Sequence, residues 1–143
     1  FLLINMEKVM CFGTFDLIHL GHLDYFKQAK KYGDYLIVVV ARDKTKQKQD
    51  KEMVFSENER LELIKNLKIV DESVLGNEEN HFKIIEEKRP DVICLGYDHS
   101  IKEEDLQDNL LKLRLFPKIV RAKAYNPDKN KTTKIKETIL QTK

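Results

Sequence analysis

The segment GTFDLIHLGH, at positions 13–22, concentrates residues that could bind an anion, since it holds two of the four histidines and two of the five glycines. His19 and His22, spaced i and i+3 across the expected start of a helix, can point the same way. Gly13 has no side chain to keep a phosphate from the backbone, and Gly21 opens a helix whose free N–H groups and positive dipole end attract anions. The segment therefore predicts a polyphosphate site at which two imidazoles meet the ligand.

Short apolar runs alternate with segments of helical spacing, and they predict the scaffold that positions this site. The runs lie at 8–12, 35–41, 73–75, 91–96 and 118–122. Continuous runs such as IVVV suit strands covered on both faces, as in a parallel sheet. We therefore expect an α/β fold with a Rossmann-like open parallel five-stranded sheet and helices on both faces. Ligands of such sheets bind beyond the carboxyl ends of the strands, where the first strand-to-helix turn is the usual phosphate cradle.

Local signals mark where several helices begin and end. Ser56 and Glu59 form the spacing of a capping box, and Gly33 is expected to end the helix that starts near Gly21. Pro90 is expected to close a third helix before its strand. We expect the polar, lysine-rich stretch at 41–53 to be a mobile loop.

Length and composition restrict the class of protein. We expect residues 1–143 to form a single domain, with 1–5, ahead of Met6, as upstream residues outside the fold. A net charge of +2 gives no field that would favour nucleic acid or a membrane surface. No apolar run approaches the roughly 18 residues that span a bilayer. Cys11 and Cys94 lie in apolar runs, which indicates buried thiols, a reducing compartment and a cytoplasmic protein.

The segment at 13–22 resembles the (H/T)xGH signature of the nucleotidyltransferase superfamily, in the GTFDxxHxGH form of its cytidylyltransferase-like branch. Further stretches carry the same resemblance: ARD at 41–43, ERLELIKNLKIVDESVLG at 59–76 with Arg60 in the arginine position, LGYD at 95–98 and TTKIKETI at 132–139. Within the branch the chain is most similar to archaeal-type FAD synthetases, which adenylylate FMN. It also resembles glycerol-3-phosphate cytidylyltransferases.

The resemblance implies that an acceptor phosphate oxygen attacks the α-phosphorus of a nucleoside triphosphate while pyrophosphate departs. Positioning and charge neutralisation carry such transfers, so His19 and His22 are expected to stabilise charge on the α-phosphoryl group and the bridging oxygen. A histidine beside polyphosphate, with an ordinary pKa of about 6.5, could be cationic at neutral pH. Thr14 and Phe15 would offer a hydroxyl and backbone N–H groups. Triphosphate chemistry also implies Mg2+ or another divalent cation, with Asp16 either an indirect ligand or a brace for the loop.

More nucleotide contacts are expected along the chain. The family has a lysine after its second strand that reaches the phosphates; Lys46, Lys48 and Lys51 compete for this role, and we favour Lys48. Asp98, just past a strand, can accept a hydrogen bond from the exocyclic amino group of adenine or cytosine. The expected catalytic residues are His19, His22 and Lys48, and the expected nucleotide-binding residues are Gly13, Thr14, Phe15, His19, Leu20, Gly21, His22, Arg60, Asp98, Tyr125, Thr132 and Thr133.

Plainer roles compete with these expectations. The histidines could cap their helix, the lysines could belong to a solvated loop, and Asp98 could shape a turn. Thr132 and Thr133 could simply cap the last helix. Arg60 lies in the first turn of its helix, where the dipole favours acids, so we expect a phosphate or an acid such as Asp43 to hold it.

Three functions stay open at this point. The leading one is transfer of AMP from ATP to FMN, and the second is a CTP-dependent cytidylyltransferase that acts on glycerol 3-phosphate or a similar phosphorylated alcohol. The third is a nucleotide-binding module without turnover, against which the intact histidine pair counts. Cytidylyltransferases carry an arginine where this chain has Asn126, which counts against CTP. We expect small-molecule partners, leave open a homodimer, and interpret His81 and His99 as surface residues.

Overall fold

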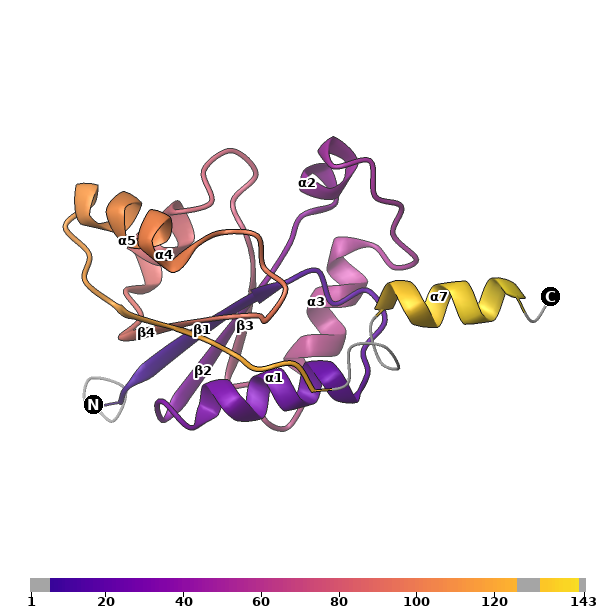
Figure 1. The fold of residues 1–143 in the computed structure, drawn as a ribbon, viewed down its shortest axis with the longest axis horizontal. Helices are drawn as coiled ribbons and strands as arrows, with labels where there is room; N and C mark the ends of the chain where they lie inside the picture. The colour runs from indigo at the N-terminus through magenta and orange to yellow at the C-terminus, as the bar shows by residue number, and fades with distance from the viewer. Residues whose placement is uncertain (1–5, 126–131, 142–143) are drawn as a thin grey trace.

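The computed structural model describes residues 6–125 and 132–141 as alternating strands and helices around one sheet (Figure 1). The elements are β1 (Lys8–Gly13), α1 (Leu20–Lys30), β2 (Tyr35–Val40), α2 (Asp43–Lys48), α3 (Glu57–Lys65), β3 (Glu72–Leu75), α4 (Lys83–Lys88), β4 (Val92–Leu95), α5 (Glu103–Lys112), β5 (Lys118–Arg121) and α7 (Thr132–Gln141). All strand pairs are parallel, and the order is β3-β2-β1-β4-β5. The predicted five-stranded parallel sheet is confirmed.

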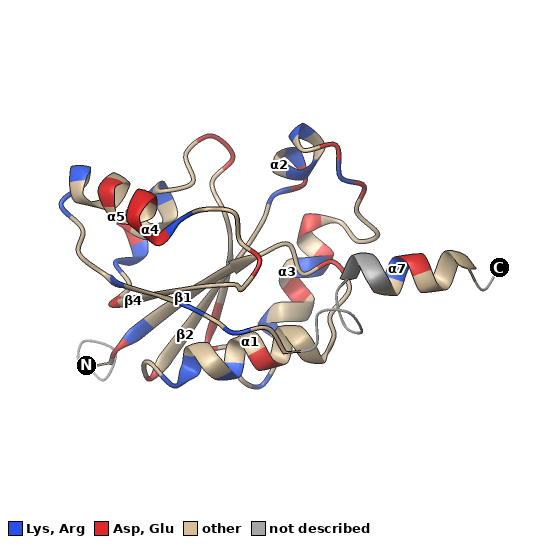
Figure 2. Ribbon diagram, in the orientation of Figure 1, with Lys and Arg blue, Asp and Glu red and all other residues tan. Residues whose placement is uncertain are grey.

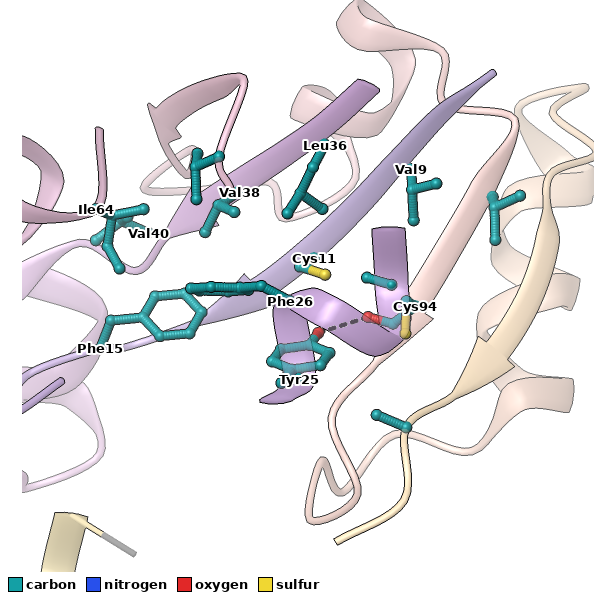
Figure 3. Packing of buried hydrophobic residues seen from close by; sticks show 14 residues of the cluster. Val9, Cys11, Phe15, Tyr25, Phe26, Leu36, Val38, Val40, Ile64 and Cys94 are labelled. Atoms are coloured by element: carbon teal, nitrogen blue, oxygen red, sulfur yellow. Dashed lines mark hydrogen bonds between the residues drawn. The ribbon is translucent and has the colours of Figure 1, made fainter. Parts of the chain in front are cut away.

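Both faces of the sheet are covered, which explains the continuous apolar run of β2. Val38 belongs to a core that includes residues of α1 and α3, whereas Ile37 and Val39 belong to a second core with residues of α4 and α5. Successive side chains of a strand point to opposite faces, so a strand between two helical layers must be apolar at every position. Figure 1 shows α1 on one side of the sheet and α4 and α5 on the other, and Figure 3 shows the first core in close view.

The strand order reverses between β1 and β4, and Tyr25 of α1 bridges these two strands. Their pairing is in register up to Cys11 and Cys94. The buried Tyr25 hydroxyl donates to the Cys94 carbonyl at 2.5 Å (Figure 3). It also accepts from the Phe12 N–H at 3.3 Å. Burial raises the pKa of Tyr25, so the hydroxyl keeps the proton that it donates. Such a reversal leaves a crevice at the carboxyl ends of the strands, which is where ligands bind in these folds.

The helix ends follow the local signals closely. Ser56 caps α3 through a capping box with Glu59, as expected. Helix α1 ends at Lys30, three residues ahead of Gly33. Helix α4 ends at Lys88, and Arg89 takes a left-handed conformation immediately before Pro90. Among the helices that the structure describes, none combines the length and apolarity that a bilayer crossing requires.

The lysine-rich stretch at 41–53 differs from the expected loop because it contains α2. Asp43 and Glu57 cap each other's helices: the Asp43 N–H donates to the Glu57 carboxylate at 2.9 Å, and the Glu57 N–H donates to the Asp43 carboxylate at 3.0 Å. Acids at helix starts satisfy free N–H groups and complement the dipole. The two residues are 14 positions apart, so no local pattern could reveal this arrangement.

Candidate active site

A cavity of about 1010 Å³ opens at the carboxyl edge of the sheet, and every strand contributes to its floor. Each strand contributes one small residue to the lining. For β1 it is the last residue of the strand, Gly13, and for β2 to β5 it is the residue just after the strand: Ala41, Gly76, Gly96 and Ala122. All five positions carry a hydrogen or a methyl group. A ligand can therefore approach the backbone at Ala41, Gly76 and Ala122, whereas the rings of Phe15 and His99 cover Gly13 and Gly96. The cavity lies at the place predicted for the polyphosphate.

His19 and His22 line this cavity and also cap α1. Nδ1 of His19 accepts from the Gly21 N–H at 3.1 Å, and Nδ1 of His22 accepts from the His19 N–H at 3.2 Å. The ring centroids lie 3.9 Å apart. Because each Nδ1 is an acceptor, the hydrogen-bond network assigns the proton of each neutral ring to Nε2. The capping role and the ligand role are thus compatible, because Nδ1 of each ring caps the helix and Nε2 stays available to donate to a ligand.

Both histidines are neutral in the free protein at pH 7. Burial lowers the pKa of His19, and burial together with the charge of His19 lowers the pKa of His22 to about 3. The pKa values are lowered because the rings have lost solvent and lie against each other. A bound polyphosphate would act in the opposite direction, since an anion favours the protonated form. The free site therefore presents two neutral N–H donors.

The turn between β1 and α1 is shaped by Phe15. Its backbone is left-handed, with φ of 56°, a conformation that costs a non-glycine residue about 1–3 kcal/mol. Its ring folds back over Gly13, so a Cβ built on Gly13 would lie 2.5 Å from the Phe15 ring. The ring also meets His22 edge to face, at a centroid distance of 5.4 Å. Gly13 thus makes room for an aromatic ring that supports His22. This differs from the expected reason for the glycine, which was the approach of a phosphate to the backbone.

Arg60 holds this turn from beneath. Its side chain is 1 % exposed, and Nη1 donates to the carbonyls of Thr14 at 2.8 Å and Ala41 at 2.9 Å. Nη2 pairs with Asp43 at 2.7 Å. Of the two expected partners the structure supplies the acid, and Arg60 does not line the cavity. In this structure Arg60 holds the turn, and its expected role in nucleotide binding stays a prediction that these contacts do not support.

Asp16 is a brace. One carboxylate oxygen accepts from the Val54 N–H at 2.8 Å and pairs with Lys136 of α7 at 2.5 Å. The other accepts from the Phe55 N–H at 2.9 Å. Burial raises the pKa of Asp16, but the hydrogen bonds from Lys136, Val54 and Phe55 lower it by more. The net pKa is below its ordinary value, so the carboxylate stays ionised. Asp16 thereby fastens α7 and the segment before α3 to the first turn.

The turn after β4 carries Asp98 and His99, and both line the cavity. Nδ1 of His99 accepts from the Gly96 N–H at 3.0 Å, and the half-buried ring covers Gly96, which corrects its interpretation as a surface residue. Burial lowers the pKa of His99. Arg121 donates to the carbonyls of Gly96 at 3.0 Å, His99 at 2.9 Å and Ile101 at 2.6 Å. Asp98 is exposed at the mouth of the cavity.

The structure separates the three candidate lysines. Lys46 and Lys51 line the cavity, whereas Lys48 is exposed and does not. Residues two apart on a helix lie on opposite faces, so α2 cannot present both Lys46 and Lys48 to the same ligand. Burial, with the charges of Lys51 and Arg60, lowers the pKa of Lys46. Lys46 is therefore the better candidate. Figure 2 shows Lys and Arg mixed with Asp and Glu on most elements, while the short helix α2 carries three lysines.

The remaining expected residues divide between cavity and surface. Gly21 and Tyr125 line the cavity, as does His81, which is exposed, in agreement with its interpretation as a surface residue. Leu20 is 59 % exposed and does not line it. Thr132 and Thr133 open α7, but their side chains, and Asn126 as a whole, lie outside the described residues. The sequence offered no motif for His81 or His99.

The described residues contain no group of three or more metal-binding side chains. The buried carboxylate at the cavity, Asp16, has both oxygens engaged by N–H groups and Lys136. The donor set therefore does not fit a resident divalent cation held by the protein alone.

The chain matches the family described as Cytidylyltransferase-like over residues 10–138 and belongs to that family. With the paired histidines at the first turn of an open parallel sheet, it is a nucleotidyltransferase.

Several relatives share most of their length with this chain and are named FAD synthase. The relative from Thermoplasma volcanium is 44 % identical over 136 residues, which cover 95 % of this chain and 96 % of the relative. The relative from Methanohalophilus mahii is 46 % identical over 116 residues, 81 % of each protein.

Solved structures give the same fold. A crystal structure from Thermoplasma volcanium, described as the lipopolysaccharide core biosynthesis protein, superposes with a TM-score of 0.83 at 48 % identity and covers 85 % of this chain and 99 % of its own. A pantoate-beta-alanine ligase from Francisella tularensis superposes with a TM-score of 0.60 at 15 % identity, covering 92 % of this chain and 65 % of its own, which shows the fold alone.

Proposed function

We propose that this nucleotidyltransferase is an FMN adenylyltransferase, which converts ATP and FMN to FAD and pyrophosphate. The observation that carries the proposal is the pair of Nε2 donors of His19 and His22, set in the cavity at the β1–α1 turn. The chain that carries this pair is 44 % identical, over nearly its whole length, to a relative named FAD synthase.

In the proposed reaction a phosphate oxygen of FMN attacks the α-phosphorus of ATP, and the bond to the bridging oxygen of pyrophosphate breaks. No covalent enzyme intermediate is needed, because positioning and charge stabilisation lower the barrier. His19 and His22 donate to the α-phosphoryl group and the bridging oxygen as negative charge develops there. Lys46 and Lys51, on the α2 side of the cavity, neutralise the phosphates. The Nε2–H groups supply these donors in the free protein, and a bound polyphosphate favours the protonated form of each ring, so the donors keep their protons as the bond breaks.

Mg2+ enters this scheme as part of the substrate, bound to the triphosphate of ATP. Mg2+ commonly keeps several waters and takes substrate phosphates with few protein ligands. This agrees with the engaged oxygens of Asp16, which leave that carboxylate as a brace.

Asp98 and Tyr125, at the mouth of the cavity, are proposed to contact the base. The Asp98 carboxylate accepts from an exocyclic amino group, and the Tyr125 ring can lie against the base. Both features suit adenine and cytosine, so a CTP-dependent cytidylyltransferase is the second candidate. The FAD synthase relatives favour ATP. Two buried free thiols, Cys11 and Cys94, support our prediction of a cytoplasmic enzyme, and a homodimer remains a prediction.

One assay separates the candidates. Pyrophosphate release is measured with ATP plus FMN and, in parallel, with CTP plus glycerol 3-phosphate, and FAD is identified by chromatography. We expect release and FAD only in the first mixture, and the His19→Ala variant serves as the inactive control. Activity confined to CTP would overturn the proposal in favour of the second candidate.

A further inference from the structure

The cavity has a second, apolar part, whose residues are not among the proposed nucleotide contacts. Its walls come from the core between the sheet and helices α4 and α5: Val39 and Leu95 on the strands, and Ile85 and Leu106 on the helices. Phe82, just before α4, and Ile101, in the loop before α5, are half-buried and also line it. The histidine pair lies at the start of α1, which covers the opposite face of the sheet (Figure 1). The cavity therefore extends across the end of the sheet, from a polar side to an apolar one.

The two sides differ in the chemistry they can recognise. The α1 side offers imidazole N–H groups, and the neighbouring α2 contributes lysines, which together suit a triphosphate. The α4–α5 side offers aliphatic and aromatic surface, whose contact with an apolar ring system removes that ring from water. A volume of about 1010 Å³ is at the upper end of the roughly 300–1,000 Å³ of a pocket for one small molecule, so the cavity is large for a nucleotide site.

A small phosphorylated alcohol would gain little from such apolar walls, because it has almost no apolar surface to bury. A flat fused-ring acceptor would gain a great deal. Gly13, which ends β1 beside the histidine turn, follows Phe12, and Phe12 packs against the apolar core. An acceptor lying in the apolar part can therefore place its phosphate at the strand ends where the α-phosphorus must be.

We propose that the apolar part of the cavity, lined at its accessible side by Phe82 and Ile101, binds the isoalloxazine ring of FMN. This inference rests on the proposed function and adds to it the location of the acceptor. The two side chains are specificity residues for the acceptor and do not touch the nucleotide.

The test compares Phe82→Ala and Ile101→Ala with Phe116→Ala, a matched control whose side chain is 78 % exposed and does not line the cavity. FMN binding is followed by the fluorescence anisotropy of FMN itself, and KM is measured separately for FMN and ATP. We expect both cavity variants to weaken FMN binding and to raise KM for FMN about tenfold, as for loss of part of an apolar contact, with KM for ATP within twofold of the parent. The control is expected to change neither constant.

Phe82 also packs on α4, so thermal unfolding is recorded for each variant, and Phe82→Leu is included because it keeps most of the packing while removing the ring. Unchanged FMN binding and KM in folded Phe82→Leu and Ile101→Ala proteins that still form FAD would overturn the location of the acceptor and leave the proposed function intact. A parent protein that forms no FAD from ATP and FMN would overturn the proposed function itself.

Discussion

The turns after β1 and after β4 are built in the same way, but the first turn is held more firmly than the second. In each, a glycine ends or follows the strand, an aromatic ring folds back over it, and a distant arginine donates to carbonyls of the turn. The first turn has Phe15 over Gly13. The second has His99 over Gly96.

The difference lies in how firmly each turn is held. Arg60 is fully buried, and it holds a turn that includes a strained left-handed residue, Phe15. Arg121 holds the second turn from a position whose side chain is 25 % exposed, beside Glu103 of α5. The first turn carries the histidines proposed to act on the breaking bond, where a small misplacement lowers the rate steeply. The second carries Asp98, proposed to recognise a base, a task that tolerates more movement.

The largest effect is expected at the first turn. Replacing His19 or His22 by alanine should lower kcat about 10²- to 10³-fold, as for loss of a preorganised donor to transition-state charge. Steady-state pyrophosphate release measures this, and far-UV circular dichroism checks the fold. A variant that keeps most of its turnover would show that the histidines do not act in the chemical step. It would also show that the first turn does not differ from the second in this respect.

The two arginines test the difference in rigidity directly. Arg60→Ala should lower the free energy of unfolding by about 3 kcal/mol, because Asp43 and buried carbonyls lose their donor. Arg121→Ala should cost less than half as much, since solvent can replace part of its contacts. Urea denaturation of both variants measures the two losses. Equal losses would show that the turns are held alike.

Asp98 tests the proposed recognition role of the second turn. Asp98→Ala should raise KM for ATP about tenfold while kcat changes little, since a charged hydrogen bond that forms in the ground state as well as the transition state is lost. Asp98→Asn, which keeps the shape, is the matched comparison. A large fall in kcat with KM unchanged would assign Asp98 to the chemical step instead.

The lysines beside the first turn give a smaller contrast. Lys46→Ala should raise KM for ATP about fivefold at low salt, because a cation near the phosphates is removed. Lys48→Ala, on the opposite face of the same helix, should leave it unchanged. The reverse result would restore the sequence-based preference for Lys48.

The smallest effect concerns pH. The fold lowers the pKa of His22 to about 3, so between that value and the unfolded pKa of about 6.5 the unfolded chain binds more protons. The contribution of the neutral His22 to the free energy of unfolding is complete above the unfolded pKa and is lost as the pH falls. Between pH 7 and pH 6 the loss is less than about 1 kcal/mol. Urea denaturation at both values should show a smaller loss for His22→Gln than for the parent. An equal or larger loss in the variant would argue that His22 is not buried as a neutral ring.

The sequence by itself determined the five strands, their parallel arrangement and the place of the histidine pair. These features depend on local patterns: continuous apolar runs for strands covered on both faces, and a glycine–histidine spacing that bridges a strand and a helix. The side chains of β2 confirm the first pattern, and the two capping imidazoles confirm that the segment lies at the expected turn.

Only the tertiary structure decided which polar residues face the cavity and which hold it in place. Arg60 reaches a carbonyl 46 residues away, Arg121 one 25 residues away, and Lys136 pairs with Asp16 across 120 residues. His99 lies at the cavity with its ring over Gly96, and helix α2 directs Lys46 rather than Lys48 toward the cavity. A charged or polar side chain can find its partner anywhere the fold brings one within 3 Å, so its role depends on distant residues that no local spacing encodes.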